Sequence, residues 1–342
     1  MNGRERILAA CRGEPPDAVP VMLHNFMMAA REAGVTMERF RTDPTAIARS
    51  FLESVERYGH DGILVDIDTV TLAAAAGVPV DRPRDEPARV AGSRIRSLEE
   101  VDDLDTVDIG SSPGIEVWLE AVRLLVRQLG GEVLIRGNCD QCPFTLASMI
   151  RGMNGWMEDL LEPSKEEAIE RLLAFSTDIS LQFISLMAAT GADMLSNGDS
   201  MAGPELVSPA IYRRCALPWE RRIVRRAHEH GLPYILHICG RTLPILTDMI
   251  ESGADGLELD HRTDARQARE LMRERAVFVG NIDPSGVLAR GTTQEVEDAT
   301  RALLSTFADT PRFILNAGCA IPAETPPENL QTMIRTARTA HA

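Results

Sequence analysis

Residues 233–261 read PYILHICGRTLPILTDMIESGADGLELDH, and this stretch decides the fold. It begins with a short apolar run, PYILHIC, which is typical of a buried strand. A helical segment, LPILTDMIESG, comes next, and a second short run, GLELDH, ends the stretch. Apolar strands that alternate with helices pair in parallel, with the helices covering the sheet. The stretch therefore predicts one strand, helix and strand unit of an α/β protein.

The same unit recurs along the whole chain. Eight strand-like runs, each followed by a helical segment, occupy residues 19–25, 62–68, 132–140, 192–199, 233–239, 256–261, 276–283 and 312–319. Eight such units predict an α/β fold in which residues 1–342 form a single (β/α)8 TIM barrel with an N-terminal helical lead-in. A doubly wound open sheet is the alternative, but no Gly-x-Gly-x-x-Gly turn follows the first run to support it.

The composition is that of a globular protein, with 44% hydrophobic and 25% charged residues. The formal net charge is −15, which disfavours binding to nucleic acid. Six cysteines are scattered over 342 residues, a pattern that favours a reducing compartment over a disulfide framework. The N-terminal residues lack the apolar core of a signal peptide, and no run approaches the ~20 apolar residues of a membrane span. We therefore expect a cytoplasmic protein that binds neither nucleic acid nor membranes.

Polar side chains follow nearly every strand-like run. In such a barrel the carboxyl ends of the strands form the mouth, where reactive groups gather. Asp199, in SNGDS, is a candidate catalytic residue, as a polar substrate contact, a fourth metal ligand or a proton carrier, and Asp260 is a second candidate. Strand-end carboxylates also start turns and cap helices, so a structural role is the alternative for both. The other polar residues at these ends include His24, Asn25, Asp66, Asp68, Asn138, Asp140, Asn197, His261, Asn281, Asp283 and Asn316.

Three residues at these strand ends are candidate metal ligands. His237 and Cys239 are two positions apart, so they share one face of the fifth strand, and Cys319 ends the eighth. In a closed barrel both strands open into the same mouth. Imidazole and thiolate ligands select zinc, and three protein ligands leave a position for substrate, as in catalytic sites. The alternative is that the two cysteines are small buried apolar residues and the histidine is a hydrogen-bonded core imidazole.

Several segments together resemble the uroporphyrinogen decarboxylase superfamily over essentially the whole chain. The branch of zinc-dependent, cobalamin-linked methyltransferases, typified by methylcobalamin:coenzyme M methyltransferases, is the most similar, because HICG is followed by a late GC. The segments that carry the resemblance are RERILAACRGEPPDAVPVM (4–22), CPFTLASMIRG (142–152), LHICGRTLPILTDMIESGADGLELD (236–260), GNIDPSGVLARGT (280–292) and NAGCAIPAETPPENLQTMI (316–334).

The resemblance implies a (β/α)8 barrel in which His237, Cys239 and Cys319 bind zinc. It implies methyl transfer between a corrinoid, methylcobalamin, and a small thiol or a small methylated substrate. The corrinoid is expected on a partner protein in trans or as free methylcobalamin, and a homodimer is a possible assembly.

Two other functions compete with this one. The first is metal-free decarboxylation of a porphyrinogen-like polyacid. It fits less well, because that branch carries an arginine-rich stretch after the first strand, where this chain has LHNFMMAAREAG with Arg31 alone. The second is a barrel that only binds and delivers a corrinoid, which the zinc-capable triad disfavours because delivery needs no activated thiolate.

Overall fold

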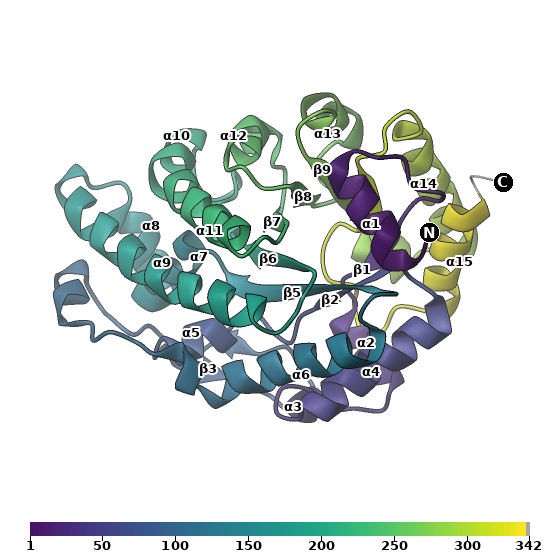
Figure 1. The fold of residues 1–342 in the computed structure, drawn as a ribbon. Helices are drawn as coiled ribbons and strands as arrows, with labels where there is room; N and C mark the ends of the chain where they lie inside the picture. The colour runs from purple at the N-terminus through teal and green to yellow at the C-terminus, as the bar shows by residue number, and fades with distance from the viewer. Residues whose placement is uncertain (340–342) are drawn as a thin grey trace.

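Eight parallel strands form a nearly closed barrel in the computed structural model, which describes residues 1–339 (Figure 1). The strand order is β1-β2-β5-β6-β7-β8-β9-β10, and a parallel bridge between Val21 and Leu315 brings the first strand beside the last. The predicted (β/α)8 barrel and all eight predicted strands are confirmed. The strands are β1 (Met22–Leu23), β2 (Gly62–Val65), β5 (Leu134–Gln141), β6 (Met194–Gly198), β7 (Tyr234–Ile238), β8 (Gly256–Leu259), β9 (Val277–Ile282) and β10 (Phe313–Ala317).

Amphipathic helices surround the strands, as the ring of coiled ribbons in Figure 1 shows. The helix before β2 illustrates why they form where they do. Asp43 caps its first turn by accepting from two backbone N–H groups, Pro44 occupies the first position, and Gly59 ends it with φ 63°. The outer helices are α4 (Pro44–Tyr58), α6 (Pro113–Leu129), α9 (Glu166–Ala188), α11 (Leu217–Glu229), α12 (Leu246–Glu251), α13 (Ala265–Met272), α14 (Thr293–Thr306) and α15 (Pro327–Thr339).

Shorter elements extend the barrel beyond its eight units. The Pro- and Arg-rich segment after β2 contains a small antiparallel hairpin, β3 (Val80–Asp81) with β4 (Arg89–Val90), which the sequence did not indicate. The short helices are α2 (Phe26–Glu32), α3 (Met37–Phe40), α5 (Thr71–Ala75), α7 (Pro143–Arg151), α8 (Met153–Asp159) and α10 (Pro209–Ile211). Short 3-10 helices span Leu98–Asp103, Ile109–Ser111, Pro163–Lys165, Ser200–Ala202 and Leu243–Ile245, and short π helices span Tyr212–Ala216 and Pro284–Leu288.

The N-terminal lead-in is a helix, α1 (Gly3–Arg12), as predicted. Asn2 and Glu5 form a capping box at its start. Ile7 is fully buried in a cluster of inward-facing residues from the amino-terminal ends of the strands, which include Leu134, Met194, Ile235 and Ile314. The helix thus plugs the end of the barrel where the strands begin. The opposite end, where the strands finish, is left for the functional site.

Candidate metal centre and cavity

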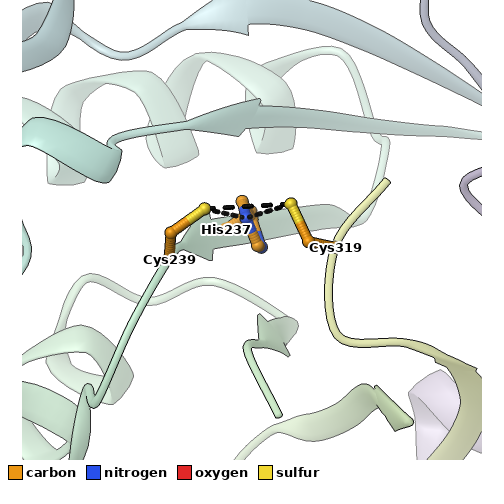
Figure 2. A group of neighbouring side chains, drawn as sticks. All are labelled: His237, Cys239 and Cys319. Carbon is orange, nitrogen blue, oxygen red and sulfur yellow. Dashed lines mark hydrogen bonds between the residues drawn. The ribbon is translucent and has the colours of Figure 1, made fainter. Parts of the chain in front are cut away.

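Three candidate metal ligands converge at the carboxyl end of the barrel (Figure 2). His237 lies in β7, Cys239 in the turn that follows it, and Cys319 in the loop after β10. The Nε2 atom of His237 lies 3.1 Å from Sγ of Cys239 and 3.9 Å from Sγ of Cys319, and the two sulfurs are 3.9 Å apart. The structure therefore brings together all three predicted metal ligands.

The spacing of the three ligands fits a tetrahedral ion. Zinc with Zn–S bonds of ~2.3 Å and Zn–N bonds of ~2.0–2.1 Å separates two sulfurs by ~3.8 Å and sulfur from nitrogen by ~3.6 Å. The observed separations of 3.1 to 3.9 Å bracket these values. Within residues 1–339 this is the one group of three His, Cys, Asp or Glu side chains whose ligand atoms come this close. The donor set and its geometry both suit zinc.

The charges of the three groups depend on one another. Hydrogen bonding from Cys319, followed by the charge of His237, lowers the pKa of the Cys239 thiol to about 3. Burial lowers the pKa of His237, but the neighbouring thiolate outweighs it and raises that pKa to about 9. Donation to the same thiolate and burial raise the pKa of Cys319 well above its ordinary value. A metal ion bound here must therefore displace the protons of His237 and Cys319.

Backbone contacts fix the direction of each ligand. The Nδ1 atom of His237 lies 2.9 Å from the main-chain oxygen of Glu258, which leaves Nε2 facing the sulfurs. Gly240 follows Cys239 with φ 89°, a conformation that favours glycine. Gly318 precedes Cys319 at a close backbone approach, because a Cβ there would lie 2.4 Å from the backbone nitrogen of His261.

Asp260 supports the turn that carries Cys239. Its Oδ2 accepts from the backbone N–H of Gly240 at 2.9 Å, and its Oδ1 accepts from that of Arg262 at 2.9 Å. Burial raises its pKa, but these two donors outweigh burial and leave the pKa below its usual value. The carboxylate thus lies beside the turn that carries Cys239, and each of its oxygens accepts a hydrogen bond from a backbone N–H group. Its catalytic role stays a prediction.

Asp199 lies outside the triad, between β6 and α7. Its Oδ1 accepts from the backbone N–H of Thr145 at 2.8 Å and from its hydroxyl at 2.7 Å. Burial raises the pKa of Asp199 to about 6, and burial together with the charge of Asp199 also raises that of Glu220. These contacts favour a structural role at the start of α7 (Pro143–Arg151), and the catalytic role remains a prediction.

A cavity of about 220 Å³ opens in front of the triad. Its apolar wall includes Phe26, Met27 and Met37. Many of the polar residues expected at the strand ends line it: His24, Asp66, Asp68, Asn138, Asp140, Asn197, His237, Cys239 and Cys319. Asp199 and Asp260 are not among its lining residues.

Two buried charged residues at the cavity were missed from the sequence. Nη2 of Arg136 lies 2.6 Å from a carboxylate oxygen of Glu258, and both side chains are 1% exposed. Glu258 also accepts from Nδ2 of Asn316 at 3.3 Å. An available signal was a charge in the middle of each apolar run, in EVLIRGNCD and GLELDH. The pair joins β5 to β8 across the barrel interior.

Among residues 1–339, no helix combines the length and the apolar character needed to cross a bilayer. All six cysteines are free, and they include both sulfur ligands of the triad.

Comparison with known proteins places this chain in a family. A model of the uroporphyrinogen decarboxylase (URO-D) family matches residues 2–340. Methylcobamide:CoM methyltransferase MtbA of Methanosarcina acetivorans is 32% identical over 244 residues, which cover 71% of this chain and 69% of the relative. MtaA of Methanosarcina barkeri, also named a methylcobamide:CoM methyltransferase, is 26% identical and covers 97% of this chain and 96% of its own length.

Relatives with a different activity align equally far. Uroporphyrinogen decarboxylase of Syntrophotalea carbinolica is 29% identical over 95% of this chain and 94% of its own. Among solved structures, a methyltransferase from Methanosarcina mazei superposes with a TM-score of 0.91 at 25% identity, covering 100% of both chains. The predicted resemblance is confirmed, and because the family model spans nearly every residue, this chain belongs to the uroporphyrinogen decarboxylase family.

Proposed function

We propose that this protein is a zinc-dependent methyltransferase that moves a methyl group between a corrinoid and a small thiol or small methylated substrate. The observation that carries the proposal is the convergence of one imidazole nitrogen and two sulfurs on a cavity at the barrel mouth. The methylcobamide:CoM methyltransferases among the relatives support corrinoid-linked methyl transfer. A family member without metal chemistry would not require this ligand set.

The protein's own residues would prepare the site in three ways. His237, Cys239 and Cys319 would hold the ion and leave one position for substrate. When bound there, zinc supplies a Lewis acid that holds the heteroatom of the substrate and lowers the pKa of a thiol. The main-chain oxygen of Glu258 keeps the imidazole in the required orientation, and the apolar wall limits the access of water.

The size of the cavity favours a small substrate. Its volume of about 220 Å³ lies below the ~300–1,000 Å³ typical of pockets for drug-sized ligands. A corrinoid is larger than such a ligand, so we place it at the rim, presented by a partner protein or free as methylcobalamin. A homodimer and a cytoplasmic location remain predictions, as does the organisation of residues 1–342 as one domain.

The charges of the cavity disfavour the alternative, decarboxylation of a porphyrinogen-like polyacid. Two guanidinium groups line it, and both have partners: Arg136 pairs with Glu258, and Arg41 donates to the main-chain oxygens of Pro83 and Glu86. Four carboxylates line the same space: Asp66, Asp68, Asp140 and Glu258. A ligand with several carboxylates would meet acidic side chains there and no guanidinium group without a partner.

Metal analysis combined with a methyl-transfer assay tests the proposal. We expect about one zinc per chain in the wild type and little in His237→Ala or Cys239→Ser, whereas Cys11→Ser, which alters a free cysteine in α1, should keep its zinc. Methylcobalamin is then offered with a panel of thiols, and the reverse reaction with methoxyarenes and methylamines. A metal-free protein that decarboxylates uroporphyrinogen and transfers no methyl group would overturn the proposal.

A further inference from the structure

A second histidine lines the cavity and forms a pair with a carboxylate. His24 follows β1, and its Nε2 lies 2.9 Å from Oδ2 of Asp66, which follows β2. The other oxygen of Asp66 accepts from the backbone N–H of Ile67 at 2.8 Å, which holds the carboxylate in place. The side chains of His24 and Asp66 are 12% and 3% exposed. This is the arrangement by which a carboxylate orients an imidazole for proton transfer.

The backbone of His24 is tied to the loop that carries Cys319. Its main-chain oxygen accepts from the N–H of Ile321, two residues past that cysteine, at 2.8 Å. Its N–H donates to Oδ1 of Asn316 at 3.3 Å. Both contacts follow from barrel closure, which sets β1 beside β10. The backbone of His24 is therefore held beside the loop that carries Cys319, and His24 lines the same cavity as that cysteine.

One ring nitrogen of His24 makes no hydrogen bond within the described residues. The Nδ1 atom is buried and has no hydrogen-bond partner within residues 1–339, and Oε1 of Glu258 lies 3.7 Å from it. The charged groups that face the ring are Asp66 from β2 and Glu258 from β8, and Arg136 from β5 neutralises the latter. Burial lowers the pKa of His24, but the two carboxylates outweigh it and raise that pKa. The imidazole is thus a stronger base than a free histidine.

We propose that His24, oriented by Asp66, is the acid–base residue of the methyl transfer. This inference rests on the proposed function and adds a proton carrier to it. In transfer to a thiol, the S–H bond breaks and its proton passes to the imidazole of His24, whose Nδ1 is the unpartnered nitrogen. The sulfur forms a bond to the methyl carbon, the carbon–cobalt bond breaks, and its electron pair stays with the corrinoid. His24 then returns the proton to solvent, and in the reverse reaction it supplies a proton to the leaving heteroatom.

The test compares His24→Gln with wild type on acceptors of different acidity. General acid–base catalysis contributes about 10²–10⁴-fold, so we expect a loss of at least ~10²-fold with an alkanethiol. The loss should shrink to a few-fold with an arenethiol, which is acidic enough to lose its proton unaided. Zinc content should match that of the wild type. A merely structural role would slow both acceptors equally or release zinc.

Two further variants distinguish the proposed role of His24 from an effect of the substitution on folding. Asp66→Asn keeps the side-chain shape and removes the charge that raises the pKa of His24, so the rise of rate with pH should begin at a lower pH. His228→Gln is the matched control, because His228 also pairs with a carboxylate, Asp255, at 2.8 Å but lies on the exposed end of α11. It should leave the rates unchanged.

The outcomes separate the two proposals. No methyl transfer by the wild type with any acceptor overturns the proposed function itself. Transfer by the wild type, with His24→Gln equally fast or equally slowed on both thiols, overturns only the role of His24.

Discussion

Asp199→Asn should change how the stability of the protein depends on pH. Asp199 is fully buried, its Oδ1 accepts two hydrogen bonds from Thr145, and its Oδ2 has no hydrogen-bond partner within residues 1–339. Burial raises its pKa to about 6. An asparagine keeps the accepting oxygen and carries no charge at any pH. The variant therefore resembles the protonated form of the wild type.

The magnitude follows from proton linkage. A carboxyl with a pKa of about 6 in the folded protein and ~3.9 in the unfolded chain takes up a proton on folding between these values. Its contribution to stability is fully present below pH ~4 and is lost as the pH rises through 6. The loss is on the order of 3 kcal/mol, at ~1.4 kcal/mol per pKa unit. Because asparagine does not titrate, the variant escapes this loss.

Urea unfolding of both proteins between pH 3.5 and 8 measures the difference. We expect the free energy of unfolding of Asp199→Asn, relative to that of the wild type, to rise by about 3 kcal/mol across this range. A constant difference would refute the assignment of a raised pKa. The same variant tests the catalytic role expected of Asp199: we expect methyl transfer within a few-fold of wild type, whereas a proton carrier would lose about 10²-fold or more.

Three other predictions concern the barrel interior and the candidate metal centre. Glu258→Gln leaves Arg136 buried without its charge partner and should lower the free energy of unfolding by about 3–5 kcal/mol in urea titrations, and a loss below 1 kcal/mol would argue against a strong pair. Gly318→Ala places a Cβ 2.4 Å from the backbone nitrogen of His261 and should reduce zinc content in metal analysis, whereas Gly92→Ala, whose Cβ meets nothing nearer than 3.6 Å, should not. Chelation should abolish methyl transfer without changing the far-ultraviolet circular dichroism, and a loss of helical signal would mean that the metal also holds the fold.

The repeating pattern of the sequence was sufficient to predict the barrel. Strand-like runs recur along the chain, separated by segments long enough to form a helix. The period of two along a strand placed His237 and Cys239 on one face. Closure of the barrel then brought Cys319 beside them, 80 residues from Cys239 along the chain. The carboxyl ends of all strands in a parallel barrel meet at one mouth. The convergence of His237, Cys239 and Cys319 could therefore be predicted without knowledge of side-chain packing.

Other features depend on packing that a linear pattern does not encode. Arg136 and Glu258 pair across the barrel, and their partnership is set by the register of non-neighbouring strands. The strands of the β3–β4 hairpin have two residues each, too few to show a period. Asp199 has the strand-end signature of a functional residue, but its carboxylate turns toward α7 and caps it. The strand end alone does not distinguish these two directions.

X-ray absorption at the zinc edge shows directly which atoms hold the metal ion. If His237, Cys239 and Cys319 hold a zinc ion with one open position, the purified protein should show two sulfur ligands and one histidine nitrogen, and adding the acceptor thiol should raise the sulfur count to three. A zinc environment without sulfur would contradict binding by these three residues. A sulfur count that stays at two while the thiol is methylated would contradict the open position for substrate.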